Sequence, residues 1–98
     1  MIRPLVFRRR VGEDLARAYQ WYDARRRGHG DEFLAGVGTT FDAIERLPST
    51  FARIHGEVRR AVVSKFPYAV FFQIEPSQVV ALAVLHTARN PKLWPGSR

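Results

Sequence analysis

The sequence contains no cysteine, so disulfide bridges, thiolate metal sites and cysteine nucleophiles are excluded. It has no long apolar run either, because the longest, residues 79–85, is far shorter than the roughly 20 residues that a membrane span needs. The N-terminal stretch MIRPLVFRRR has too short an apolar segment for a secretory signal. We therefore expect a cytoplasmic protein that has no membrane partner.

Acidic residues are scarce at both ends of the chain. The 98 residues include 16 lysines and arginines but only 9 aspartates and glutamates, for a formal net charge of +7. Residues 1–10 hold four arginines and no acid, and residues 58–98 hold six basic residues and one glutamate, whereas residues 11–57 are slightly acidic. High-GC coding raises arginine content, but this segregation predicts an anionic partner, either a nucleic acid or an acidic protein.

Hydrophobic residues make up 46% of the chain, so we expect a single domain over residues 1–98 with one core. After a short strand at residues 5–8, apolar residues recur at helical spacing in two segments. These predict helices at about residues 12–27 and 31–47, with a turn at residues 29–30. Such a short turn requires an antiparallel helix hairpin.

Two features of the predicted helices carry further expectations. Glu13 and Asp14 fall in the first turn of the first helix, where negative charge is favourable to the helix dipole. Gly36 and Gly38 lie inside the second helix, each at a cost of roughly 1 kcal/mol relative to alanine. We expect these glycines to let the first helix cross closely.

Three strands are predicted to follow, at residues 58–64, 69–75 and 79–86. The last is apolar at nearly every position, which is typical of a central strand buried on both faces. The element order predicts an α+β fold with a helix hairpin on one face of a small, mostly antiparallel four-stranded sheet. Because two helices cover one face only, we expect the other face, which carries Phe71, to expose an apolar surface for a partner.

Three motifs follow one another in the chain. W-Y-D with a charged run and a G-x-G turn spans residues 21–30, V-R-R and F-P-Y-x-V-F-F span residues 58–60 and 66–72, and A-V-L-H-x-x-R-N-P-x-x-W spans residues 83–94. Together they resemble the RelE/ParE superfamily, the toxins of type II toxin–antitoxin modules, which include plasmid stabilisation proteins. The resemblance implies a β-α-α-β-β-β fold and a small bacterial toxin. It also implies a cognate acidic antitoxin that covers the open sheet face.

The superfamily has two activities. ParE-like members poison DNA gyrase and have no agreed catalytic residues, whereas RelE-like members cut messenger RNA on the ribosome without a metal. We favour the ParE-like branch because the RelE-like pattern is incomplete: no lysine pair precedes the strand at residues 58–64, and no tyrosine follows Tyr68. A ribosome-dependent endoribonuclease and a degenerate member that only binds its antitoxin, or DNA as a co-repressor, stay open as alternatives. No cofactor is expected.

If the chain is RelE-like, the resemblance also implies its catalytic residues. Cleavage through the RNA 2′-hydroxyl needs an acid, a base and cations around the phosphate. Arg59 and Arg60 match the basic positions of the strand at residues 58–64, and Arg89 matches the one after the last strand. His86 has a usual pKa near 6.5 and would be the acid or base. Glu57 is an alternative base.

The residues expected to bind a protein partner overlap with this set. Arg60, Phe71, Arg89 and Trp94 lie on the predicted open face or in the tail that follows the last strand. The partner is expected to be the antitoxin, and the target either gyrase or the ribosome with its message.

These residues also have structural interpretations. His86 ends a buried strand, and such a histidine is more often bonded into the fold, where it orients the following tail. Arg59 and Arg60 alternate between the two faces of a strand, so one of them is expected to pair with a helix carboxylate such as Asp23 or Glu45. His55 and His86 are too few for a metal site without acidic partners at ligand spacing, so no metal site is predicted.

Overall fold

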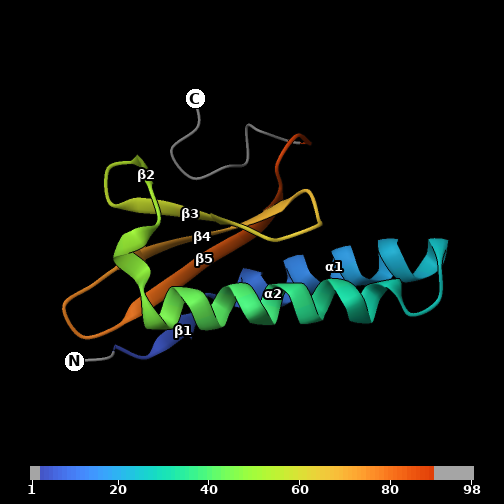
Figure 1. The fold of residues 1–98 in the computed structure, drawn as a ribbon, viewed down its shortest axis with the longest axis horizontal. Coiled ribbons are helices and arrows are strands. Elements are labelled where there is room, and N and C mark those ends of the chain that lie inside the picture. The colour runs from blue at the N-terminus through green and yellow to red at the C-terminus, as the bar shows by residue number, and fades with distance from the viewer. Residues whose placement is uncertain (1–2, 90–98) are drawn as a thin grey trace.

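Two helices pack on one face of a mixed five-stranded sheet (Figure 1). The structure, a computed structural model, describes residues 3–89. The α+β class and the helix hairpin were both predicted, and both are confirmed. In chain order the elements are β1 (Leu5–Phe7), α1 (Arg9–Arg25), α2 (His29–Arg46), the short 3-10 helix η1 (Pro48–Thr50), β2 (Arg53–His55), β3 (Val58–Val62), β4 (Tyr68–Ile74) and β5 (Val79–His86).

The last of these strands lies in the centre of the sheet. The strand order is β1-β5-β4-β3-β2, so β5 pairs in parallel with β1 on one side and antiparallel with β4 on the other. β3 pairs antiparallel with both β4 and β2. Residues 79–81 of β5 are all buried, which the continuous apolar run predicts for a strand with neighbours on both sides. The prediction of a buried central strand is confirmed.

The sheet has one strand more than predicted. β2 pairs with β3 across a two-residue turn in which Gly56 has a φ of 55°. All three residues of β2 are exposed, so the segment lacks the alternation of buried and exposed residues that identifies a strand from sequence. The expectation of four strands was therefore wrong at this edge.

The first helix begins earlier than its apolar pattern indicated. α1 starts at Arg9 rather than at Gly12, and its first turn contains no acidic residue. Asp14 therefore lies in the second turn and is buried. The expectation that Glu13 and Asp14 lie in the first turn, where their negative charge is favourable to the helix dipole, is wrong.

The turn between the helices also differs from the prediction. His29 and Gly30 belong to α2, and the reversal is made at Gly28, whose φ of 90° lies in the left-handed region. Asp23 of α1 supports this reversal, because its Oδ1 accepts the backbone N–H groups of Gly28 at 2.9 Å and Gly30 at 3.2 Å. The carboxylate thereby satisfies N–H groups at the start of α2 that have no partner within the helix.

The core lies between the helix hairpin and the sheet. Tyr22 of α1 stacks on Phe33 of α2 with 5.3 Å between ring centroids, and Phe66 and Tyr68 pack against both rings. Aromatic pairs in these geometries add about 1 kcal/mol each beyond their buried area. The apolar stripe of α2 meets the sheet through fully buried side chains: Phe33, Val37, Ile44, Val70, Phe72, Val79 and Val84.

Gly30 of α2 lies against Tyr19 of α1 with no room for a side chain. A Cβ atom at this position would lie 2.9 Å from the carbonyl oxygen of Tyr19. A Cβ atom at Gly36 would instead lie 3.3 Å from Cγ1 of Val63, just after β3, and a Cβ atom at Gly38 would meet no heavy atom within 4 Å. The expectation that Gly36 and Gly38 admit the first helix is wrong, because a short turn brings hairpin helices closest together at their joined end.

β1 forms one edge of the sheet, and a side chain of α2 binds its backbone. The N–H of Leu5 donates to Glu45 Oε2 at 3.1 Å. On the opposite side of β1, the N–H of Val79 donates to the carbonyl of Pro4 at 2.9 Å. Edge strands are prone to pair with strands of other molecules through their free backbone N–H and C=O groups. The Glu45 carboxylate binds one of these groups, the N–H of Leu5.

The sheet face opposite the helices is buried at its centre, contrary to expectation. Phe71 of β4 is 0% exposed, and Val80 and Ala83 of β5 are buried as well. The strand register places Arg60 directly beside Phe71, and an arginine stem can cover apolar surface. Val62, at the margin on β3, stays 58% exposed. The expected open apolar face is therefore wrong at the middle of the sheet.

Candidate functional site

A cleft of about 300 Å³ lies between α1 and the end of β5. Three guanidinium groups, an imidazole and two aromatic rings line it, and Asp14 is the one acid among its lining residues that the structure describes. This concentration of positive charge makes the cleft the candidate functional site. Its lining residues are Arg10, Asp14, Arg17, Ala18, Trp21, Tyr68, Val84, Leu85, His86 and Arg89.

Asp14 is the buried centre of the cleft, with 4% of its surface exposed. Its Oδ1 accepts from Nη2 of Arg10 at 3.1 Å and Nη2 of Arg17 at 2.9 Å. Its Oδ2 accepts from Nε of Arg10 at 3.1 Å and from the backbone N–H of Val84 at 2.9 Å. A buried charge is tolerated when it is paired and hydrogen-bonded in this way. Asp14 thereby joins two surface arginines of α1 to the middle of β5.

Val84 needs this partner because β1 is too short to reach it. β1 follows β5 as far as Phe7 opposite Ala81, and the N–H of Arg8 still donates to the Ala81 carbonyl at 3.0 Å. The chain then turns into α1, so β5 continues beside a helix instead of a strand. The Asp14 carboxylate takes the place of a backbone carbonyl in the sheet, which leaves the buried N–H of Val84 satisfied.

Arg89 and Trp21 form one side of the cleft. Nη2 of Arg89 donates to the hydroxyl of Tyr68 at 3.1 Å, and its Cζ lies 5.2 Å from the Trp21 ring centroid. Cζ of Arg25 lies 3.6 Å from the same ring, and its Nη1 donates to the Trp21 carbonyl at 3.0 Å. Cation–π attraction therefore holds two guanidinium groups against one indole.

His86 orients the chain that follows β5. Its Nδ1 accepts the backbone N–H groups of Ala88 and Arg89, both at 3.0 Å, and its ring packs edge-on against Tyr68. The neutral ring then carries its proton on Nε2. Burial, together with the positive charge of Arg89, lowers the pKa of His86 from its usual 6.5. These contacts agree with the structural interpretation of His86.

The lowered pKa of His86 predicts a pH-dependent stability. Between that pKa and the usual 6.5, the unfolded chain binds a proton that the folded chain does not, so the free energy of unfolding falls as the pH falls. A His86→Asn variant keeps an oxygen acceptor for the two N–H groups, as in an Asx turn, and does not titrate. Urea denaturation at about pH 7.5 and about pH 5.5 should show a smaller loss of stability in this variant than in the wild type.

The exposed His55 provides the control for this prediction. His55→Asn should keep the wild-type loss of stability between the two pH values, because it changes an exposed residue and leaves His86 and its contacts intact. If His86→Asn loses as much stability on acidification as the wild type and His55→Asn do, His86 does not carry the pH dependence.

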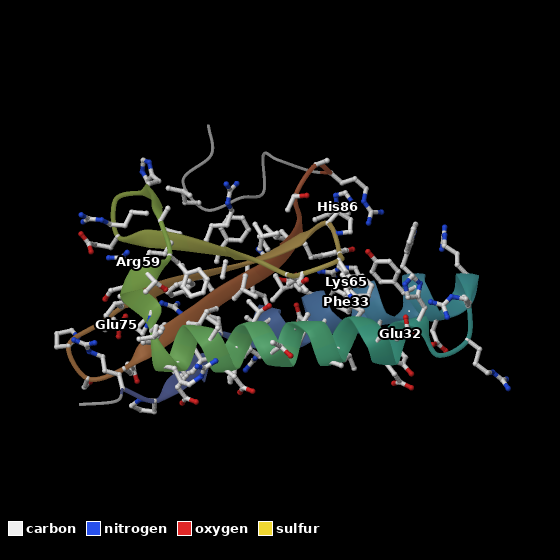
Figure 2. The ribbon with its side chains drawn as sticks, viewed as in Figure 1. Glu32, Phe33, Arg59, Lys65, Glu75 and His86 are labelled. Carbon is white, nitrogen blue, oxygen red and sulfur yellow. The ribbon has the colours of Figure 1, made fainter. Side chains whose placement is uncertain are left out.

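Arg59 lies far from the cleft. Figure 2 shows Arg59 and His86 at opposite ends of the sheet. Nη1 of Arg59 donates to the carbonyl oxygens of Phe51 at 2.6 Å and Ser49 at 3.3 Å, so it binds the backbone around η1. A helix carboxylate was expected as the partner of one of the two arginines, and for Arg59 this is wrong. Asp23 and Glu45 instead accept backbone N–H groups, at the start of α2 and at β1.

The residues expected to bind a partner divide between two surfaces. Arg60 and Phe71 lie opposite each other on β3 and β4, on the sheet face away from the helices. Arg89 lies in the cleft together with His86. Trp94 lies outside the described residues. The three described members of this set therefore do not lie on one surface.

Sequence reasoning missed the other half of the cleft, namely Arg10, Asp14 and Arg17. A usable signal was present, because Asp14 lies three residues after Val11 and four before Ala18, on the buried stripe of α1. Arginines stand four residues before it and three after it. An acid on a buried stripe, flanked by cations at helical spacing, indicates a buried ion pair.

The chemistry of the cleft is that of arginine forks, which bind the oxygens of carboxylates or phosphates. Within residues 3–89 there is no group of three or more His, Cys, Asp or Glu side chains that could hold a metal ion. Neither α1 nor α2 is long and apolar enough to cross a membrane.

Comparison with known families decides the assignment. Residues 5–91 match the family described as the ParE toxin of the type II toxin–antitoxin system, parDE. The chain belongs to the ParE toxin family. This ParE toxin is thus a component of a type II toxin–antitoxin system, and the resemblance to the RelE/ParE superfamily is confirmed.

A solved structure supports the fold of this ParE toxin. It is described as the chromosomal ParDE TA system from P. aeruginosa, with 13% sequence identity and a TM-score of 0.78. The match covers 87% of this chain and 96% of that chain, and at this identity it shows the fold alone. No curated protein sequence matches the chain.

Proposed function

We propose that this ParE-family toxin inhibits growth by acting on DNA gyrase, and that a cognate acidic antitoxin neutralises it. The observation that carries the proposal is the family match, which spans residues 5–91 and therefore every described helix and strand. Gyrase poisoning is the activity that the resemblance implies for ParE-like members. The net charge of +7 favours an acidic protein as the neutralising partner.

The geometry around His86 gives further support, because it does not suit RNA cleavage. A general base needs a nitrogen lone pair directed at the proton that it removes. The Nδ1 lone pair of His86 accepts two backbone N–H groups, and Nε2 carries the ring proton in that tautomer. Arg59, one of the cations expected around the scissile phosphate, binds backbone oxygens at the other end of the sheet. Of the residues expected for RNA cleavage, His86 and Arg89 share the cleft, whereas Arg59 lies apart from them.

Purified toxin mixed with gyrase and plasmid DNA tests the proposal. We expect inhibition of supercoiling and accumulation of protein-linked cleaved DNA, detected after denaturation and protease treatment on agarose gels. The His86→Asn variant should retain this activity at roughly the wild-type level, because it keeps the turn that follows β5 and removes only the imidazole.

Ribosomes programmed with a message provide the contrasting assay. Codon-positioned cuts that disappear in His86→Asn, with no effect of the toxin on gyrase, would overturn the proposal in favour of a ribosome-dependent endoribonuclease. No growth defect on induction and no activity in either assay would favour a member that only binds its antitoxin or DNA.

Neutralisation is tested with the product of the neighbouring reading frame. Co-expression of that protein should restore growth, and addition of the purified protein should restore gyrase supercoiling in proportion to the amount added. Continued growth arrest in the presence of a co-purifying neighbour would contradict neutralisation by that protein.

A further inference from the structure

We propose that the cleft between α1 and β5 binds a carboxylate side chain of an acidic peptide, and that it is a docking point for a protein partner. The chemistry of the cleft alone determines the class of ligand. The identification of that partner as the antitoxin rests on the proposed function.

The first observation is an excess of positive charge. Arg10, Arg17 and Arg89 line the cleft, and Asp14 neutralises one of these three guanidinium groups. The guanidinium group of Arg89 donates to the hydroxyl of Tyr68. This hydroxyl is neutral, so the contact does not compensate the positive charge of Arg89. Asp14 engages only part of the N–H donors that Arg10 and Arg17 carry. The cleft therefore attracts an additional anion.

The second observation is that the guanidinium groups are held in place before any ligand binds. The side chain of Arg17 is 71% exposed and that of Arg10 is 42% exposed, yet both are fixed by a carboxylate that is 1% exposed. Arg89 is fixed by Tyr68 and by the Trp21 ring. Long exposed side chains usually lose rotamer entropy on binding, so this arrangement lowers the entropic cost of docking.

The third observation concerns the kind of anion. Single-stranded nucleic acids bind by stacking bases on aromatic faces beside a basic groove. Cζ of Arg25 lies 3.6 Å and Cζ of Arg89 lies 5.2 Å from the Trp21 ring centroid, and Trp21 is 38% exposed, whereas Tyr68 is 7% exposed. A base that stacks on Trp21 would therefore compete with two guanidinium groups, and Tyr68 offers no open face for a base. A volume of about 300 Å³ accommodates a side chain with its flanking backbone, so an acidic peptide fits better than a nucleic-acid strand.

The test is a titration of the isotope-labelled chain with a short polyglutamate peptide, followed by nuclear magnetic resonance. We expect shifts of the Trp21 indole N–H and the Val84 amide signals, which report on the two walls of the cleft. The double variant Arg17→Gln, Arg89→Gln should bind the peptide at least about fivefold more weakly, since charge-assisted hydrogen bonds are lost. The double variant Arg46→Gln, Arg53→Gln has the same net charge with both changes outside the cleft, and it should bind within about twofold of the wild type.

Several outcomes would overturn the inference. Equal weakening in both double variants would mean that the peptide senses only the overall charge. Unmoved Trp21 and Val84 signals would place any binding elsewhere, and tighter binding of a single-stranded oligonucleotide that shifts the same signals would make the partner a nucleic acid. None of these results depends on gyrase, so a toxin that fails to act on gyrase can still bind the peptide, and one that poisons gyrase can still fail to bind it.

Discussion

Replacing Asp14 with alanine is expected to lower the free energy of unfolding by about 3 kcal/mol. The carboxylate is buried and accepts four hydrogen bonds, one of them from the backbone of Val84, a residue 70 positions away in the chain. Its loss leaves the buried N–H of Val84 without a partner. It also leaves Arg10 and Arg17 next to each other with no negative charge between them. Urea denaturation monitored by circular dichroism measures the change.

Asp42 is the matched control, because it is an exposed aspartate in α2. Asp42→Ala should stay within about 0.5 kcal/mol of the wild type. Hydrogen exchange gives a local readout, since the Val84 amide should lose protection in Asp14→Ala beyond the loss explained by global stability. A loss of stability below about 1 kcal/mol, with the Val84 amide still protected, would show that this carboxylate does not replace a strand neighbour for β5.

Two glycine-to-alanine substitutions in the same helix are expected to change stability in opposite directions. Gly30→Ala places a methyl group 2.9 Å from the Tyr19 carbonyl oxygen, which the helix hairpin can relieve only by moving apart, and it should cost about 2 kcal/mol. Gly38→Ala meets no heavy atom within 4 Å and restores helix propensity, so it should gain about 1 kcal/mol. Thermal and urea denaturation of both variants measure the two effects.

The pair forms its own control, because both changes add one methyl group to α2. Stabilisation by Gly30→Ala would mean that the two helices are not in contact at their joined end. Destabilisation by Gly38→Ala would mean that this position is packed against another part of the molecule. Either result would contradict the arrangement of the hairpin.

The sequence predicted those elements whose burial is periodic or continuous. The apolar run of residues 79–86 predicted a strand buried on both sides, and the structure places it between two neighbours. The helical spacing predicted both helices, which begin two or three residues earlier in the structure than predicted. β2 escaped notice because three exposed residues carry no pattern, although glycine at the first position of the turn that follows it was a hairpin signal.

The candidate site was predicted less well, because it depends on contacts between segments far apart in the chain. His86 and Arg89 were assigned to the site by resemblance, at the end of the last strand and just after it, and they do share one cleft. Nothing in the local sequence reveals that Asp14 reaches the N–H of Val84, since this follows from the length of β1. Arg59 was assigned to the site by resemblance, whereas the carbonyl groups around η1 determine where its side chain lies.

The central place of β5 ties the existence of the cleft to the synthesis of residues 79–86. β5 is the last strand of the described chain, yet β1, β4 and α1 all bind to it. A ribosome delivers the N-terminal segments first, so β1 and the hairpin emerge without the strand that they pack beside. A fragment that terminates before residue 79 lacks one wall of the cleft, so the cleft is complete only after β5 has been synthesised.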